Sequence, residues 1–274
     1  MMLFSAMLAD SSASDLKGTR FRLVELAETG STNADLVGLA RAGERTFLAV
    51  RTGFQSAGRG RRDRSWDAPP GSGLMMSVLF PAGQQDEVAS HAQQMASCLG
   101  FAALRACVTS GADVALKWPN DIVGPVLSDG TLPKLAGVLG ETVTRGTKVL
   151  GVVVGVGLNL RPVPERAAAL GRSVVALDEI TDQRVSPTEM AKATLRELEL
   201  ILTRLAQADG AEWLRGELFG VSAVIGRDIE VVTDGESIGG LAIDIDADGR
   251  LVVETAAGRH TISVGDVVSA RVRN

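Results

Sequence analysis

A stretch rich in glycine and arginine at residues 53–66 constrains the fold of this chain more than any other segment. It follows an apolar run at residues 47–50 that is typical of a short buried strand. It precedes residues 67–73, which contain two prolines and two glycines and cannot be helical. The stretch is therefore predicted to be a long loop attached to a strand. Such loops are uncommon inside compact domains, and many of them are functional.

This segment, which we call the arginine loop, is suited to binding an anion. Arginines stand at positions 59, 61, 62 and 64, and guanidinium groups bind phosphate or carboxylate oxygens two at a time. Glycines 58 and 60 permit close approach of the backbone to a ligand, and Trp66 offers a flat face that could stack on a base. A solvated basic surface is the alternative. The net charge of −5 argues against a general nucleic-acid surface and favours one local anion site.

Composition limits the class of protein. The 274 residues are 45% hydrophobic, which is enough for one large domain or two smaller ones with real cores. The only cysteines, Cys98 and Cys107, lie in an apolar helical pattern and are predicted to be buried thiols in a reducing compartment. The first eight residues lack the basic start of a signal peptide, and no apolar run approaches about 18 residues. We expect a cytoplasmic protein with no membrane partner.

Hydroxyl and amide side chains follow the first predicted strand, at residues 21–26. Ser31 or Thr32 occupies the position of a helix N-cap, with Asn33 and Asp35 in the first turn of a helix that reaches about residue 42. These groups either cap the helix only, or they also bind the polar head of a ligand through hydroxyls and free backbone N–H groups.

Two lysines interrupt apolar strand patterns. Lys117 precedes Pro119, which ends its strand, and Asn120 and Asp121 follow as an ordinary turn pair. Lys134 begins another apolar run. A lysine in such a run must either extend to solvent or meet a buried anion.

Further strands are predicted at residues 74–80, 134–141 and 149–160, and helices at 87–108, 165–180 and 187–215. Glycines 137, 155 and 157 leave a floor without side chains, on which the apolar tail of a ligand could lie. The Gly-Val-Gly run at 155–157 lacks the third glycine and the following helix of a dinucleotide-binding fingerprint, so NAD binding is rejected.

After residue 218 the pattern changes to short alternating runs at 221–225, 229–233, 237–245, 250–255, 259–263 and 267–272. Turn dipeptides separate most of them, which predicts a small, barrel-like all-β module. Residues 1–19 are predicted to be a flexible tail.

Five motifs, in order, resemble those of biotin protein ligases. They are Ser-Thr-Asn at 31–33, the loop from Gln55 to Trp66 with Gly-Arg-Gly-Arg-Arg, Lys-Trp-Pro-Asn-Asp at 117–121, Lys-Leu-Ala-Gly at 134–137 and Gly-Val-Gly-Leu-Asn at 155–159. Each motif is weak alone, but their order makes a specific signal. The later helices and the β module also resemble that family, so the likeness covers most of the chain.

The resemblance implies an α+β fold with a mixed-sheet catalytic domain at residues 20–217 and a small SH3-like barrel at 218–274. It implies activation of biotin by ATP and Mg to biotinoyl-5'-AMP and pyrophosphate. Biotin then passes to one lysine of the biotin carboxyl carrier domain of an acyl-CoA carboxylase, a step that serves fatty acid synthesis. Some members add a DNA-binding winged helix; the short segment before the first strand leads us to expect no DNA partner.

The resemblance also assigns site residues. The residues implied to bind biotin are Ser31, Thr32, Asn33, Gln55, Gly58, Arg59, Lys134, Gly137 and Gly155. The residues implied to bind ATP or the adenylate are Arg61, Arg64, Trp66, Lys117, Asn120 and Asn159. Lys117, Lys134, Arg59 and Asp121 are the candidate catalytic residues. The metal ligands stay undefined, and Mg is expected to arrive with the nucleotide.

The implied chemistry agrees with the residue types. Attack of a carboxylate on a phosphate brings two anions together, and lysines and arginines would supply the counter-charge. Residues 58–70 are predicted to be mobile without ligand and to order over the labile adenylate. Asp121 either orients or deprotonates the incoming amine, or has a turn or metal-facing role.

Two alternatives remain open. Lipoate or octanoate ligase or transferase chemistry uses a related fold, although the arginine loop and the motif at 117–121 favour biotin. A non-catalytic RNA-binding or adaptor protein would need basic residues spread over a face with interleaved aromatics, whereas aromatic residues make up only 4% of the chain.

Overall fold

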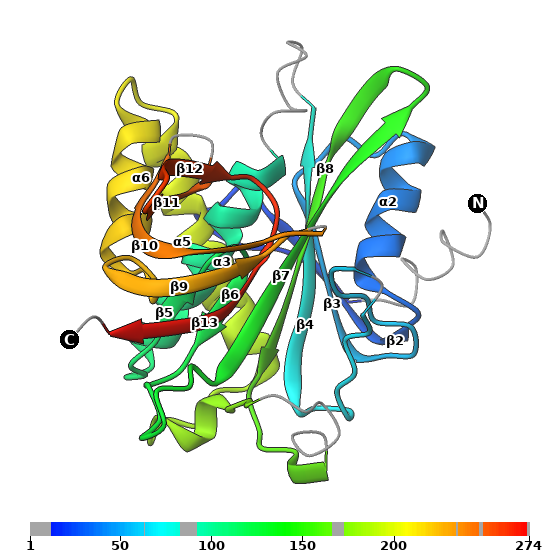
Figure 1. Cartoon of the computed structure of the whole chain (residues 1–274). Coiled ribbons are helices and arrows are strands. Elements are labelled where there is room, and N and C mark those ends of the chain that lie inside the picture. The colour runs from blue at the N-terminus through cyan, green and yellow to red at the C-terminus, as the bar shows by residue number, and fades with distance from the viewer. Residues whose placement is uncertain are drawn as a thin grey trace.

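One eight-stranded mixed sheet organises the first 160 residues of the computed structural model (Figure 1). The structure describes residues 12–62, 64–82, 92–165, 173–233, 235–246 and 249–272. In spatial order the strands are β1 (Ser12–Asp15), β2 (Arg22–Thr29), β3 (Leu48–Gln55), β4 (Gly73–Pro81), β8 (Lys148–Asn159), β7 (Lys134–Arg145), β6 (Asp121–Val123) and β5 (Ala115–Lys117). Neighbours β2 and β3 are parallel and the other pairs antiparallel, as the predicted mixed sheet requires.

The two faces of this sheet are covered unequally. Helices α3 (Ala92–Thr109) and α5 (Pro187–Leu205) cover one face, where Leu74 and Met76 of β4 join the main core. Helix α2 (Thr32–Ala42) packs through Leu36 on Leu79 and Val153 of the opposite face, where residues of the other parity point. Because α2 covers only one end of that face, the rest of it is left for a cleft. None of the helices in the described ranges is both long and apolar enough to cross a membrane.

The first residues of two helices carry the sequence signals that are typical of helix N-caps. Ser31 is the N-cap of α2, and its side chain accepts a hydrogen bond from the Ala34 N–H at 3.5 Å. Ser186 and Glu189 form a capping box at the start of α5, with Pro187 in the first turn. Helix α6 (Gly210–Gly220) follows α5 after a short break, so the helical stretch predicted at 187–215, with an interruption at Gly210, is confirmed as two helices.

The C-terminal module is a second, antiparallel sheet in the order β12 (Gly258–Ile262), β11 (Leu251–Thr255), β10 (Ser237–Ile245), β9 (Arg227–Val232), β13 (Asp266–Val272). It has its own core, which Trp118 of the other module joins; the indole N–H donates to the Gly249 carbonyl at 3.0 Å. In the described residues β12 and β13 are the two edges, so closure into a barrel stays a prediction.

Three expectations for local structure are wrong. Residues 12–15 form β1, paired with β2, and are not a flexible tail. In the described part of residues 165–180 the only helix beyond Glu165 is a 3₁₀ turn, Leu177–Glu179; residues 173–175 instead pair with Lys134 of β7 through backbone hydrogen bonds of 3.0 Å. Residues 221–225 are not a strand, because Ser222 makes only an isolated bridge to Leu116.

The predicted boundary near residue 218 falls inside α6, which ends at Gly220. The domain limits therefore stay a prediction. His91 and the predicted helical turn before Ala92 lie outside the described residues.

Both cysteine thiols are expected to resist modification in the folded protein. Cys98 and Cys107 are buried in α3, and burial raises the pKa of each thiol to about 12. Only the thiolate reacts, so 5,5′-dithiobis(2-nitrobenzoate) at pH 8 should label neither thiol until denaturant is added. Labelling of the native protein at the rate of the unfolded chain would contradict this burial.

Candidate functional site

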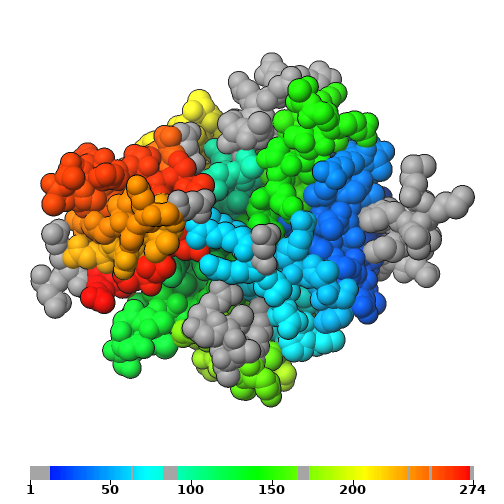
Figure 2. Space-filling model, turned by 45° about the vertical axis from the view of Figure 1, so that its right-hand side comes forward, coloured from blue at the N-terminus to red at the C-terminus, as the bar shows by residue number. Residues whose placement is uncertain are grey.

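A cleft of about 1550 Å³ lies on the face of the sheet that α2 leaves uncovered. The arginine loop forms one wall and the C-terminal sheet another; in Figure 2 the cyan segment that contains the loop touches the orange and red C-terminal sheet. The cleft brings together most of the predicted site residues. These are Ser31, Thr32, Asn33, Gln55, Arg59, Arg61, Arg64, Trp66, Lys117, Asn120, Asp121, Lys134, Gly137 and Gly155.

The arginine loop is folded in its described part, although a structureless loop was expected. The Trp66 N–H donates to the Gly58 carbonyl at 2.9 Å, and the Gly60 N–H donates to the Arg64 carbonyl at 2.7 Å. A Cβ at Gly58 would lie 2.1 Å from the Trp66 carbonyl oxygen, so only glycine permits this close return of the chain. The described part of the loop therefore folds back on itself and places Arg59, Arg61 and Arg64 at the cleft. Its ordering on ligand binding stays a prediction.

The glycine floor of the sheet is covered by side chains of the protein itself. The indole of Trp66, only 9% exposed, lies on Gly157, where a Cβ would be 2.3 Å from Trp66 Cε2. At Gly155 a Cβ would be 2.2 Å from Asn33 Oδ1. These glycines thus make room for Trp66 and Asn33. That the apolar tail of a ligand also lies on this glycine floor stays a prediction.

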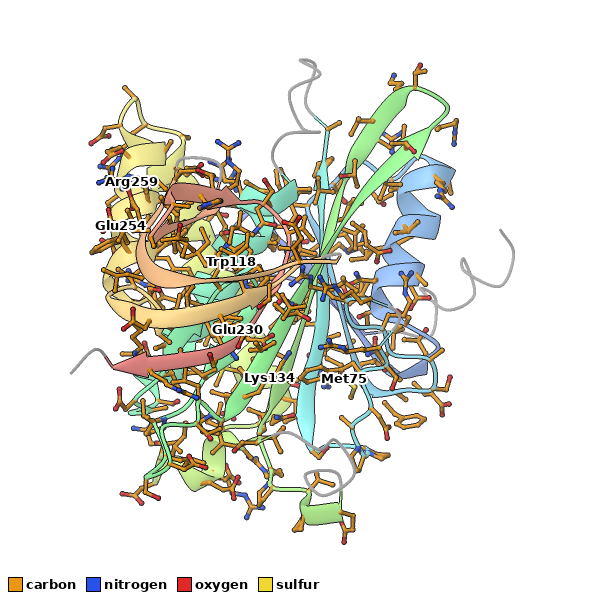
Figure 3. The ribbon with its side chains drawn as sticks, viewed as in Figure 1. Met75, Trp118, Lys134, Glu230, Glu254 and Arg259 are labelled. Carbon is orange, nitrogen blue, oxygen red and sulfur yellow. The ribbon has the colours of Figure 1, made fainter. Side chains whose placement is uncertain are left out.

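Lys134 meets an anion, which was one of the two outcomes expected of a lysine in an apolar strand. Its Nζ lies 2.5 Å from Asp121 Oδ1 and 5.8 Å from the centre of the Trp66 ring. The pairing of β6 with β7 positions the carboxylate, because Asp121 stands opposite Gly137 in the ladder. Figure 3 labels Lys134 on β7 and Met75 on β4, both of which line the cleft. With its side chain 14% exposed, Lys134 is a partly buried cation at the cleft floor.

A continuous chain of polar contacts connects the arginine loop to the start of α2. Glu141 Oε2 accepts hydrogen bonds from Arg59 Nη2 at 2.8 Å and from Asn33 Nδ2 at 2.7 Å. Asn33 Oδ1 accepts from Ser77 Oγ at 2.5 Å, and Ser77 Oγ is 2.6 Å from Thr32 Oγ1. The Thr32 N–H donates to Gln55 Oε1 at 2.9 Å, which completes the chain.

Two members of this chain, Glu141 and Ser77, were missed in the sequence. Each had a signal: Glu141 ends the apolar run that Lys134 begins, and Ser77 is a hydroxyl inside an otherwise apolar strand. The strand pattern placed both in the sheet. Which residues they would meet depended on the packing of α2 and the loop.

Replacing Glu141 with glutamine should raise the KM for the ligand held by Arg59 and Asn33 by about tenfold and leave kcat nearly unchanged. A neutral amide loses the charge-assisted bond to Arg59, which is worth roughly 1.5–3 kcal/mol when desolvated and less at this partly exposed site. Steady-state kinetics with the concentration of the ligand implied by the resemblance varied would measure it. The matched control is Glu230→Gln, because Glu230 is an exposed residue of the C-terminal sheet. A fall in kcat alone would contradict a positioning role for Glu141.

Two further predicted residues, Asn159 and Asn120, donate hydrogen bonds to backbone carbonyls. Asn159 Nδ2 donates to the carbonyls of Val175 (3.2 Å) and Lys134 (3.4 Å), so it holds the segment at 173–175 against β7. Asn159 and Gly58 are the predicted site residues that do not line the cleft in the described structure. Asn120 donates to the Val138 carbonyl at 2.7 Å and accepts from Arg61 at 3.0 Å, which connects the loop to the β5–β6 turn.

The electrostatics of the cleft suit an anionic ligand with more than one charged group. Lys117, Lys134, Arg59, Arg61 and Arg64 converge on it from three elements. Within the described residues no group of three His, Cys, Asp or Glu side chains could hold a metal ion. Low dielectric strengthens each cation's attraction for a ligand in the cleft.

Comparison with known proteins agrees with this geometry. Residues 43–159 match the biotin/lipoate A/B protein ligase family, and residues 224–268 match the biotin protein ligase C-terminal domain. The chain is 32% identical to the biotin–[acetyl-CoA-carboxylase] ligase of Mycobacterium tuberculosis over 93% of this chain and 91% of that protein. It is also 32% identical to the ligase of the same name from Paracoccus denitrificans, over 88% of this chain and 98% of that protein.

A solved structure supports the fold. Biotin protein ligase from Aquifex aeolicus, in complex with biotin and ATP, superposes with a TM-score of 0.73 at 24% identity. The match covers 92% of this chain and 99% of that one.

Proposed function

The chain belongs to the biotin protein ligase family, and from that premise we propose that it attaches biotin to a carrier protein in two steps within this cleft. Biotin and ATP first react to biotinoyl-5′-AMP and pyrophosphate. The biotinyl group then passes to a lysine of a biotin carboxyl carrier domain of an acyl-CoA carboxylase in the cytoplasm. The observation that supports this most is the pairing of Lys134 with Asp121 beneath Trp66, at the floor of a cleft lined by three loop arginines.

In the first step a carboxylate oxygen of biotin attacks the α-phosphorus of ATP, and the bond to the bridging oxygen of pyrophosphate breaks. We assign Lys134 and Lys117 to the reacting carboxylate and α-phosphate, where negative charge gathers. Arg61 and Arg64 face the same space from the loop and would hold the outer phosphates. Donors fixed before the reaction stabilise that charge without reorganisation.

We assign biotin to the polar chain at the start of α2. Thr32, Asn33, Gln55 and Arg59 offer donors and acceptors that are already oriented by one another. Ser31 and the first N–H groups of α2 add a helix N-terminus with its positive dipole. Such an arrangement suits the ureido ring of biotin. Trp66, Asn120, Gly137 and Gly155 line the cleft and keep the roles that the resemblance implies. Gly58 and Asn159 do not line it, and we assign them to shaping the arginine loop and the segment at 173–175.

In the second step the carrier lysine amine attacks the acyl carbonyl and AMP leaves. The amine must lose a proton, and Asp121 is the carboxylate at the cleft floor that could accept or orient it. Its ion pair with Lys134 holds it at the cleft floor, where we assign the reacting carbonyl. Asp121→Ala should then slow transfer from preformed adenylate more than adenylate formation.

Magnesium fits this site only as a partner of the nucleotide. Asp121, the carboxylate at the cleft floor, forms an ion pair with Lys134. Asn120 accepts a hydrogen bond from Arg61 and donates one to the Val138 carbonyl. A hard cation with few protein ligands is typically carried by substrate phosphates, which it neutralises and orients.

The test is to incubate the purified protein with biotin, MgATP and a carrier domain, and to follow pyrophosphate release and protein-bound biotin. Both should appear, and both should depend on biotin. A parallel reaction with lipoate and a lipoyl carrier domain addresses the related chemistry. Transfer of lipoate in place of biotin, or biotin-independent pyrophosphate release, would overturn the proposal.

A further inference from the structure

One carboxylate of the C-terminal sheet binds three arginines of the arginine loop. Asp266 Oδ2 lies 3.0 Å from Arg64 Nη2 and 3.1 Å from Arg62 Nη1, and Asp266 Oδ1 lies 3.4 Å from Arg61 Nη1. These loop residues are about 200 positions away in the sequence. Asp266 thus connects the C-terminal sheet to the arginine loop across the cleft.

The position of Asp266 is fixed by its own sheet. It is the first residue of β13 and stands opposite Val232 of β9. At the preceding Gly265 a Cβ would lie 2.7 Å from Val231 Cγ1, so the turn into β13 is packed tightly against β9. The Asp266 side chain is 25% exposed at the cleft edge. A rigid support of this kind can hold a flexible loop in one position.

Charge balance allows the same arginines to serve a nucleotide. Three guanidinium groups share one carboxylate, and two of them, those of Arg61 and Arg64, also line the cleft. Each guanidinium has five N–H donors, and Arg61 already divides its donors between Asp266 and Asn120. Asp266 can therefore hold the loop while phosphate oxygens bind the other N–H donors of the same guanidinium groups.

We propose that Asp266 is a positioning residue that fastens the arginine loop over the cleft, so that the C-terminal sheet retains the reactive adenylate until the carrier lysine arrives. The inference rests on the proposed function for the identity of the retained intermediate. Its structural part, closure of the loop by Asp266, does not depend on that function.

The loop-closing part is tested by limited trypsin digestion, because trypsin cleaves after arginine. Asp266→Asn should increase the rate of cleavage within residues 59–64 by about tenfold, as expected when three partly screened ion pairs are lost. Asp266→Arg should increase it further through repulsion, and Asp266→Glu should restore slow cleavage. The matched control is Glu254→Gln, on the same sheet but far from Lys134 (Figure 3). The thermal midpoint of each variant monitors general destabilisation.

The retention part is tested by loading each variant with biotin and MgATP without carrier, then measuring the rate at which biotinoyl-adenylate appears in the filtrate. Release should be about tenfold faster from Asp266→Asn than from the wild type or Glu254→Gln. Equal cleavage and equal release for wild type and Asp266→Asn would overturn the inference. Absence of adenylate from the wild type would count against the proposed function, and the trypsin rates would then decide the role of Asp266.

Discussion

Replacing Lys134 with methionine is expected to lower biotin-dependent exchange of labelled pyrophosphate into ATP by two to three orders of magnitude. Removal of one oriented donor to a developing anion typically costs about 10²–10³ in rate. Lys134 is 14% exposed, lies 2.5 Å from Asp121 and faces the cleft floor, so water replaces its charge poorly. Methionine is unbranched and nearly as long as lysine, so the main change is the loss of the charge.

The variant also leaves the Asp121 carboxylate without Lys134, and that effect needs its own control. Lys134→Met with Asp121→Asn removes both charges. If the loss comes from missing positive charge at the reacting phosphate, the double variant stays as slow as the single one. Recovery to within tenfold of the wild type would show that the unpaired carboxylate caused the loss, and Lys134 would not be catalytic.

Gly58→Ala is expected to reduce the exchange rate by about a hundredfold while the protein stays folded. The new Cβ would lie 2.1 Å from the Trp66 carbonyl and 2.9 Å from Gln55 Nε2, so the base of the arginine loop must open. Opening displaces Arg59, Trp66 and Gln55 together, and a misplacement of about 1 Å can cost about 10²-fold in rate. The loop lies outside the main core, so the thermal midpoint should fall by only a few degrees.

Gly38→Ala in the exposed part of α2 is the matched control, because nothing lies within 4 Å of its Cβ position. Alanine stabilises a helix relative to glycine by roughly 1 kcal/mol, so activity should persist and stability should rise slightly. Wild-type activity in Gly58→Ala would mean that the loop closes without the Gly58–Trp66 contact. A large drop in the thermal midpoint would instead place Gly58 in the folding core.

Much of the fold could be predicted from local patterns. The cap at Ser31, the capping box at Ser186 and Glu189, and the apolar runs of β4 and β8 depend on residues within one turn or one strand. The errors have a different origin. Residues 12–15 and 173–175 contain weak local signals and became ordered by pairing with β2 and with Lys134. A pattern within a segment does not indicate a partner elsewhere in the chain.

The candidate site shows the same difference between local patterns and contacts with other parts of the chain. Lysines inside apolar strands and arginines between glycines can be recognised in the sequence. A charge in an apolar strand indicates a site because its burial costs free energy unless an opposite charge or a ligand pairs with it. Glu141 was missed because its importance lies in two contacts, with Arg59 and Asn33, from separate elements. Asp266 was missed because it stands in a different sheet from the loop that it holds.

The sequence by itself determined which chemistry this protein can support, since the number and kind of cationic, hydroxyl and glycine residues near one another are local properties. Only the tertiary structure decided how these side chains are positioned relative to one another. The hydrogen bond of Arg59 to Glu141, the packing of Trp66 on Gly157 and the attachment of the loop to Asp266 each join segments far apart in the chain. Such contacts form when burial and pairing outweigh the loss of chain entropy, and that balance is set by the whole fold.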